Sequence, residues 1–152
     1  MNNTAVQRDV FDKVGMFNEQ LHLGEDIELC FRCLDRGVGL FFIPGTPVGH
    51  FDRNTLKGVW EHYYRIGEYS PIIRSLRPDS PYRWLFPKNR FMAALLFLPL
   101  TMLKTVYITN CWLRRDPSVL LFMPGIYMTN VAYYFGLYKT LGKKTERVRA
   151  RE

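Results

Sequence analysis

Two long apolar runs in the second half of the chain constrain its fold more than any other feature. The first covers 91–113 with Lys104 as its single charge, and the second covers 118–138 with no charge. About 20 apolar residues in a helix are enough to cross the hydrocarbon core of a bilayer. The link between the runs, 114–117, is short and polar. We therefore expect a hydrophobic helical hairpin, with two membrane helices over 91–138.

Other arrangements of the two runs stay open. The hairpin could instead be buried inside a soluble protein. Pro99 and Lys104 weaken the first run as a membrane span, because a proline can kink a helix and a charge is costly inside a bilayer. This run could therefore lie in the membrane interface, form part of a re-entrant hairpin, or turn Lys104 toward the partner helix.

The positive charges predict the orientation of the hairpin. The chain has a formal net charge of +7. Basic residues gather outside the two runs, at Arg83, Lys88 and Arg90 on one side and Lys139, Lys143, Lys144, Arg147, Arg149 and Arg151 on the other, whereas the link holds Arg114 and Arg115. By the positive-inside rule, both ends of the hairpin face the cytoplasm. We expect a multi-pass cell-membrane protein whose remaining segments are cytoplasmic.

The same charges predict a lipid partner and no nucleic acid. Basic residues next to a membrane attract anionic lipid. A nucleic-acid-binding module would need a recognisable fold or aromatic residues interleaved with the basic ones, and the sequence has neither. Membrane lipid is therefore the expected partner of this basic surface.

A pair of acids, Glu25 and Asp26, stands between Gly24 and an apolar-patterned segment that reads as a helix. Acids in the first turn of a helix are stabilised by the helix dipole whatever their function. One interpretation is therefore a helix-capping role. The other is catalytic, because a carboxylate held at the start of a helix can act as a general base.

A set of spaced residues from Asn3 to about Gly67 resembles the acceptor-side half of family 2 inverting glycosyltransferases of the GT-A fold. The matching residues are Arg8, Phe11, Val14, Gly15, Phe17, Glu19, Leu21, Gly24, Glu25, Asp26, Glu28, Leu29, Cys30, Arg32, Gly37, Pro44, Val48 and His50. The resemblance implies that Asp26 is the general base and that Glu25 is its catalytic neighbour. Glu28 lies close in sequence but on another face of the helix, so we interpret it as a support residue. It also implies transfer of a sugar from a nucleotide-sugar donor to a hydroxyl of a glycan or lipid-linked acceptor. By analogy, the process is cell-envelope or exopolysaccharide glycan synthesis.

Three further residues are candidates for binding. In related enzymes a histidine near the position of His50 approaches the metal or the nucleotide diphosphate, so His50 is a candidate ligand for Mg²⁺ or Mn²⁺ as well as a candidate structural residue. The segment from His62 to Gly67 is loosely similar to the family's Gln-x-x-Arg-Trp segment, without its Gln or Trp. On that likeness, Arg65 could neutralise a leaving diphosphate, with His62 as a second substrate-binding candidate.

The family's nucleotide-binding half has no counterpart in this sequence. In the family that half precedes the Glu-Asp region and carries an Asp-x-Asp metal motif, and no Asp-x-Asp occurs here. We expect the chain to be the C-terminal part of a larger enzyme or a truncated gene product, inactive and unable to bind a sugar nucleotide tightly without the missing half. The competing hypothesis is a non-catalytic membrane-associated remnant that binds a partner.

The expected fold class is an α/β fragment, mostly helical with a few short strands, followed by the hydrophobic hairpin. Helices are predicted over 9–13, over 26–36 with Gly37 after its end, and over 55–76 with a break at Pro71; strands are predicted over 38–43 and 48–51. The expected division is a GT-A part over 1–78, a linker over 79–90, membrane helices over 91–138 and a basic cytoplasmic tail over 139–152. Cys30 and Cys33 are expected to pack as small apolar residues.

Overall fold

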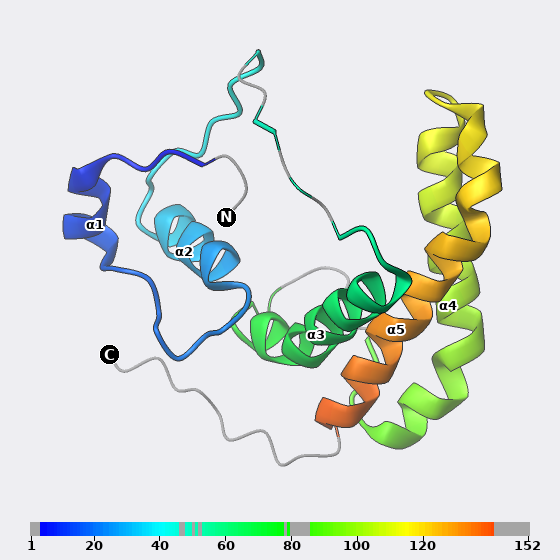
Figure 1. Cartoon of the computed structure of the whole chain (residues 1–152). Helices are drawn as coiled ribbons and strands as arrows, with labels where there is room; N and C mark the ends of the chain where they lie inside the picture. The colour runs from blue at the N-terminus through cyan, green and yellow to red at the C-terminus, as the bar shows by residue number, and fades with distance from the viewer. Residues whose placement is uncertain are drawn as a thin grey trace. The chain divides into compact units, whose positions relative to one another are not determined.

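The computed structural model describes residues 4–45, 48–49, 51, 53–77, 79 and 86–141. The chain divides into two compact units, Met1–Asp52 and Arg53–Glu152. Unit 1 contains α1 (Arg8–Val14) and α2 (Glu25–Asp35). Unit 2 contains α3 (Leu56–Ser75), α4 (Arg90–Leu113), the short 3₁₀ helix η2 (Pro117–Phe122) and α5 (Met123–Leu141) (Figure 1).

The core of unit 1 forms where α2 packs on the end of α1. Val14, Leu29 and Cys33 are buried together, and Val10, Phe11, Phe17 and Val38 pack around them. The end of α2 is set by Gly37, whose φ of 69° is a left-handed conformation that glycine adopts at little cost. The amide of Val38 then donates to the carbonyl of Cys33 at 2.8 Å, which closes the helix end. The predictions for these two helices are confirmed.

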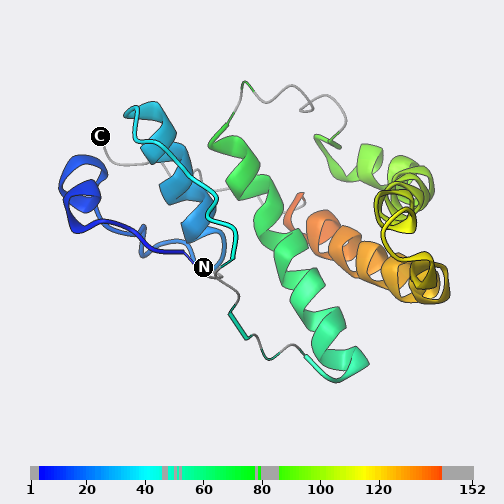
Figure 2. The same ribbon diagram turned by 90° about the horizontal axis from the view of Figure 1, so that it is seen from above.

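Unit 2 is a helical unit in which α5 lies between α3 and α4 (Figure 2). Ala93, Tyr133, Tyr134 and Leu137 form its buried core, and Ile66, Phe97, Leu100 and Leu141 pack against them. The sequence sets the start of two helices, because Thr55 Oγ1 accepts from the amide of Gly58 at 3.1 Å and Asn89 Oδ1 accepts from that of Met92 at 2.9 Å.

Two glycines let α3 and α5 approach until their backbones touch. A Cβ added at Gly136 would overlap the carbonyl oxygen of Tyr64 and lie 2.8 Å from the amide nitrogen of Glu68. A Cβ added at Gly67 would overlap the carbonyl oxygen of Tyr133 in the same way. The helix crossing therefore depends on the absence of a side chain at both positions.

A polar seam joins α4 and α5. Thr101, Thr105 and Thr109 follow one another at four-residue intervals on α4, and all three are buried. Asn130 of α5 is buried opposite them, and its Nδ2 donates to Thr105 Oγ1 at 2.9 Å. The Thr105 hydroxyl in turn donates to the carbonyl of Thr101 at 2.8 Å. The hydroxyls of Thr101 and Thr105 and the amide nitrogen of Asn130 are thus hydrogen-bonded, whereas the buried Thr109 Oγ1 has no partner among the described residues.

The prediction of an α/β fragment is wrong. The described residues contain no strand, and the whole of 38–43 is irregular. A strand requires a neighbour to share its backbone hydrogen bonds, and no described segment pairs with this one. Leu40, Phe41, Phe42 and Ile43 are instead exposed, by 50%, 89%, 90% and 68%. Of the second predicted strand, Val48, Gly49 and Phe51 are described and are also irregular.

The prediction of two membrane helices is also wrong. In the described part of the chain, α4 is the one helix that is long and apolar enough to cross a membrane. The second run divides into η2 and α5, and α5 includes Gly125, Thr129 and Asn130 among its apolar residues. The two runs do form a helical hairpin, but its second arm lacks the length and apolar character of the first. The predicted break at Pro71 is wrong as well, because α3 continues through it to Ser75.

Candidate functional site

The candidate catalytic acids occupy the first two positions of α2. Gly24 precedes them with a φ of 86°, a left-handed conformation that turns the chain sharply into the helix. Glu25 and Asp26 are both half-buried, and Asp26 Oδ1 accepts a hydrogen bond from the amide of Ile27 at 2.8 Å. The unpaired amides and the dipole at a helix start favour negative charge there. The geometry is that of two adjacent carboxylates that are partly accessible at the start of a helix.

Arg32, two turns along α2, fastens this helix to the end of α1. Its Nε donates to Glu28 Oε1 at 2.7 Å and its Nη2 donates to Glu28 Oε2 at 2.9 Å, which is a bidentate ion pair. The same guanidinium donates to the carbonyl of Val14, to that of Gly15 at 3.1 Å and to that of Met16 at 2.8 Å. Glu28 is therefore a structural partner of Arg32, in agreement with its interpretation as a support residue.

The contacts of Arg32 have a simple electrostatic basis. The last carbonyls of a helix carry a partial negative charge and need donors. At the end of α1 these donors come from α2, because Arg32 binds the carbonyls from Val14 to Met16 and Arg36 donates to that of Lys13 at 2.9 Å. Gly15 suits this site, since its φ is 81° and an added Cβ would lie 3.4 Å from Arg32 Nη1. The start of α2 is thereby held on a fixed scaffold.

We predict that Arg32→Lys lowers the free energy of unfolding of unit 1 by about 2 kcal/mol, because an ammonium cannot reproduce the forked, charge-assisted bonds of the guanidinium. Denaturant titration followed by circular dichroism, together with hydrogen exchange of the amides at 14–17, measures the loss. Arg36→Lys is the matched control, since Arg36 bonds one carbonyl. Equal losses in the two variants would contradict the role given to Arg32.

The two cysteines of α2 pack within unit 1. Cys33 is buried and Cys30 is half-buried, and neither forms a disulfide. Burial raises the pKa of the Cys30 thiol above its usual value, and the nearby Cys33 and Asp26 raise it further. The thiol is therefore neutral at physiological pH, which does not suit a nucleophile or a metal ligand.

The described residues do not assemble a metal site. No three His, Cys, Asp or Glu side chains of the described ranges come close enough together to hold an ion. His50, the predicted metal ligand, lies outside the described residues. The divalent metal therefore stays a prediction for the complete enzyme.

The two predicted substrate-binding residues belong to unit 2. His62 and Arg65 are three residues apart on α3, so they share one side of the helix. His62 is half-buried, with its ring 5.5 Å from that of Tyr63 in an edge-on arrangement, and Arg65 is exposed. Glu25 and Asp26 form one pair in unit 1, and His62 and Arg65 form a second pair in unit 2.

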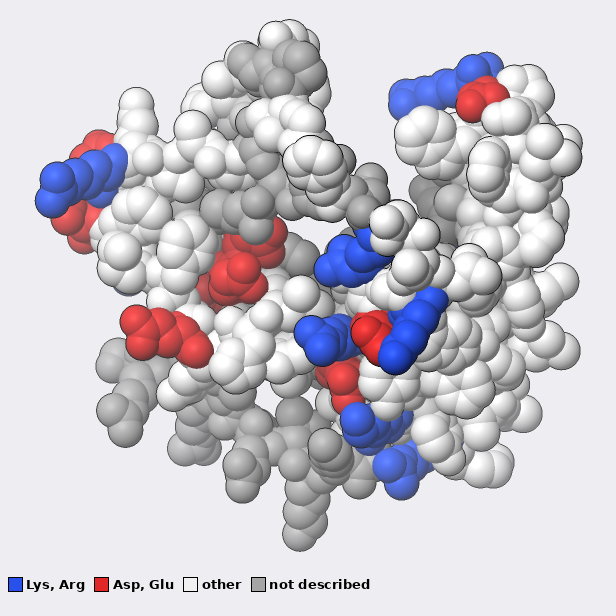
Figure 3. Space-filling view, in the orientation of Figure 1, with Lys and Arg blue, Asp and Glu red and all other residues white. Residues whose placement is uncertain are grey.

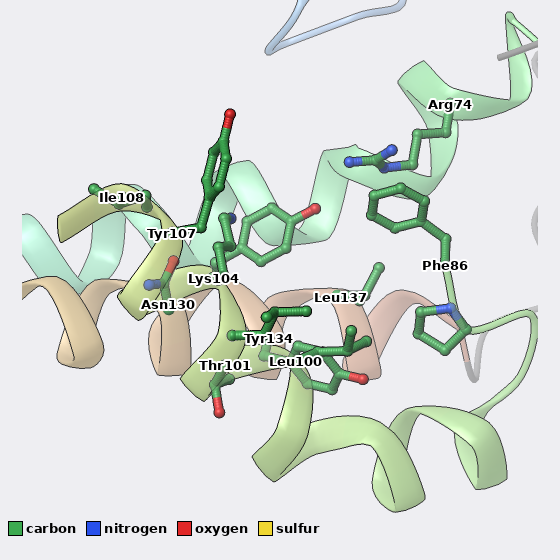
Figure 4. Close-up of a pocket in the computed structure, with 13 residues that line it drawn as sticks. Arg74, Phe86, Leu100, Thr101, Lys104, Tyr107, Ile108, Asn130, Tyr134 and Leu137 are labelled. Atoms are coloured by element: carbon green, nitrogen blue, oxygen red, sulfur yellow. The ribbon is translucent and has the colours of Figure 1, made fainter. Parts of the chain in front are cut away.

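Unit 2 also contains a cavity that the sequence did not predict. Its volume is about 620 Å³, and its wall includes Arg74, Phe86, Leu100, Lys104, Tyr107 and Leu137 (Figure 4). The residues come from α3, α4, α5 and the segment just before α4. The one sequence signal was Lys104, a charge inside an apolar run, whereas nothing in the sequence singled out Arg74.

Comparison with known proteins gives a short match to a glycosyltransferase. Over 44 residues the chain is 41% identical to the pre-mycofactocin glycosyltransferase of Mycobacterium tuberculosis, in both strain CDC 1551 / Oshkosh and strain H37Rv. The match covers 29% of this chain and 9% of each relative. No family model and no solved structure matches the chain. The likeness thus indicates glycosyl transfer in general terms, and membership of family 2 stays a prediction.

Proposed function

We propose that the chain is the acceptor-side segment of an inverting, family 2 glycosyltransferase, which moves a sugar from a nucleotide-sugar donor to a hydroxyl acceptor. The observation that carries the proposal is the placement of Glu25 and Asp26 at the start of a helix that Arg32 anchors. A general base must be ionised, partly accessible and firmly positioned. The partial match to a glycosyltransferase supports the same reaction class.

In the proposed mechanism, a carboxylate oxygen of Asp26 takes the proton of the acceptor hydroxyl. The hydroxyl oxygen bonds to the anomeric carbon as the bond from that carbon to the diphosphate breaks, so the configuration inverts and a nucleoside diphosphate leaves. Glu25 is the neighbouring acid at the start of the same helix. Positive charge stabilises a departing diphosphate, and Arg65, with His62 beside it, is the proposed group of this chain for that role.

We further propose that α4 attaches the enzyme to the cell membrane. Only 17% of its most apolar stretch is buried within the protein, whereas the core helix of a soluble protein would be mostly covered. Leu95, Leu98 and Leu103 are exposed by 68%, 59% and 64%. Figure 3 shows the surface of α4 nearly free of charge, with charged side chains at the link that follows it. We propose that the segment before α4 lies in the cytoplasm, where nucleotide sugars are made. The proposed process is cell-envelope or exopolysaccharide glycan synthesis.

Membrane attachment through α4 predicts the behaviour of the chain in an alkaline carbonate wash. The chain should remain in the membrane pellet, because a spanning helix is not released with peripheral proteins. Leu98→Glu should shift it toward the supernatant, since a charge on the lipid-facing side opposes insertion. Tyr63→Glu, at an exposed position of α3, is the control and should leave the chain in the pellet. Complete release of the unaltered chain would disprove the attachment.

The alternative function is that of a non-catalytic, membrane-associated protein that binds a partner. One observation favours it, namely the exposed apolar segment from Leu40 to Ile43 in unit 1. Contiguous apolar surface of this kind is typical of interfaces. In this alternative the acids at the start of α2 serve only to stabilise the helix.

A transfer assay tests the proposed function against the alternative. The chain is expressed from its gene together with any in-frame coding region that precedes it, and membranes are incubated with a panel of labelled UDP-, GDP- and dTDP-sugars. We expect label from one donor class to enter a glycan or lipid product. Absence of transfer from every donor by membranes that contain the folded protein would favour the non-catalytic alternative.

A further inference from the structure

The cavity of unit 2 combines an apolar wall with two cations. Leu100, Leu103, Ile108 and Leu137 contribute apolar side chains, and Arg74 and Lys104 contribute the positive charges. Its volume of about 620 Å³ lies within the usual range of small-molecule sites. Figure 4 shows the side chain of Arg74 extending over Phe86 toward the side on which Lys104 lies.

Aromatic rings hold both cations at the cavity. The guanidinium carbon of Arg74 lies 3.1 Å from the centre of the Phe86 ring, and Arg74 Nε donates to Ser70 Oγ at 3.0 Å. Lys104 Nζ lies 3.9 Å from the centre of the Tyr133 ring. Such contacts fix the direction of a cation without neutralising it. Arg74 from α3 and Lys104 from α4 are thus both held at the same cavity.

The charges of this site are unbalanced. Arg74 and Lys104 both line the cavity and are both positively charged. No carboxylate lines the cavity, and neither cation forms an ion pair with an acid in the described part of the chain. An anion placed between them would accept charge-assisted hydrogen bonds from both. Charge complementarity therefore favours a negative group at this end of the cavity.

The rest of the wall suits a hydrocarbon chain. Leu103 and Tyr107 line the cavity and are also exposed on α4, by 64% and 67%. The cavity is therefore continuous with the apolar surface of the one helix that is suited to a membrane. A ligand with a long tail could enter along α4 without placing that tail in water.

We propose that this cavity binds a lipid whose head is a phosphate-type anion, with the head between Arg74 and Lys104 and the tail along α4. We favour a membrane lipid over free phosphate as the ligand, because only a lipid has a hydrocarbon chain that can contact the apolar wall. The site is independent of the proposed glycosyl transfer, since none of the residues proposed for transfer lines the cavity and its test requires no turnover.

Binding of simple amphiphiles tests the proposal. The full chain, purified in a neutral maltoside detergent, is titrated with dodecyl phosphate, dodecanol and inorganic phosphate, and bound ligand is counted by native mass spectrometry. We expect one dodecyl phosphate per chain, bound roughly tenfold or more tightly than either other probe, because only it offers both the anion and the chain. Equal binding of dodecanol would reduce the cavity to an apolar one, and equal binding of inorganic phosphate would make it a free-anion site. Either result overturns the proposal.

Substitutions locate the site. Arg74→Gln and Lys104→Gln should each weaken dodecyl phosphate binding roughly tenfold, and Lys104→Arg should largely restore it. Lys57→Gln removes a charge from an exposed position of α3 outside the cavity and should have no effect. Helix content from circular dichroism confirms that each variant is folded. Equal weakening by Lys57→Gln, or unchanged binding in both cavity variants, would show that the chain attracts the anion without using this site.

Discussion

Replacing Asp26 by asparagine should lower sugar transfer by ~10²- to 10⁴-fold while leaving nucleotide-sugar binding nearly unchanged. The amide keeps the shape of the carboxylate but cannot accept the proton of the acceptor hydroxyl, and general-base catalysis contributes about this factor. The position is held by the backbone of α2 and by the contacts of Arg32 and Glu28, none of which needs the charge of Asp26. Turnover and donor binding are measured on the protein expressed with its preceding coding region, by labelled transfer and by calorimetry.

Two further variants separate a catalytic role from a structural one. Glu25→Gln removes the neighbouring acid and should reduce transfer less than Asp26→Asn. Asp35→Asn removes an exposed acid at the far end of the same helix and should leave transfer unchanged. Near-normal turnover in Asp26→Asn would rule out Asp26 as the base. A loss of helix stability equal to the loss of activity would assign the acids to helix capping.

Replacing Gly136 by alanine should destabilise unit 2 by about 3 kcal/mol or more, because an added methyl group meets backbone and not a movable side chain. Its Cβ would overlap the carbonyl oxygen of Tyr64 and crowd the amide of Glu68, so α3 and α5 would have to separate. Separation would also strain the hydrogen bond between Ser70 Oγ and the Tyr133 hydroxyl, which measures 2.6 Å. Denaturant titration in detergent, followed by circular dichroism, measures the loss.

Gly125 provides the matched control for this experiment. It lies on the same helix, but a Cβ at Gly125 would have no neighbour within 4 Å. Gly125→Ala should therefore stabilise the helix by up to about 1 kcal/mol through its higher helix propensity. The opposite signs of the two alanine variants would identify backbone contact as the cause. A Gly136→Ala variant as stable as Gly125→Ala would show that α3 and α5 do not touch at this point.

The helices of this protein follow from local rules, and these were predictable. Gly37 ends α2 in the expected left-handed conformation, and the acids before Ile27 begin it. Such signals act over one or two turns, so they need no knowledge of the rest of the fold. The predicted interruption of α3 at Pro71 failed because the turn before the proline is packed on α5, where Gly67 meets the backbone of Tyr133 and Ser70 Oγ lies 2.6 Å from the Tyr133 hydroxyl. The contacts between α3 and α5 outweighed the cost of a proline inside the helix.

The prediction of strands failed because it also depended on contacts beyond the local sequence. The apolar, partly β-branched and aromatic run over 38–43 is typical of a strand, but a sheet exists only if a second strand is present. None occurs in the described ranges, so Phe41 and Phe42 remain exposed. The prediction of a second membrane helix failed for a different reason. Counting uncharged residues overlooked the polar amide of Asn130 and the hydroxyl of Thr129, which lower the hydropathy of this run.

The candidate site was predictable only in part. A motif located Glu25 and Asp26, because their neighbours in sequence are also their neighbours in space. The clamp formed by Arg32 joins residues up to 18 positions apart, and the pairing of Arg74 with Lys104 joins two helices, so neither follows from spacing. The placement of Lys104 over Tyr133 confirms one of the alternatives left open for the first run, that the lysine turns toward the partner helix.

The seam between Thr105 and Asn130 determines the register of the helix pair. Apolar helices can slide along one another at little cost, since one hydrocarbon contact replaces another. A slide of one turn would carry Asn130 away from Thr105 and leave a buried amide without its partner, at a cost of about 1–3 kcal/mol. That cost falls on every shifted arrangement and not on the native one. Asn130 therefore fixes the alignment of α4 and α5. The position of Lys104 relative to α5 depends on this hydrogen bond, because Lys104 adjoins Thr105 in sequence and both Lys104 and Asn130 line the cavity.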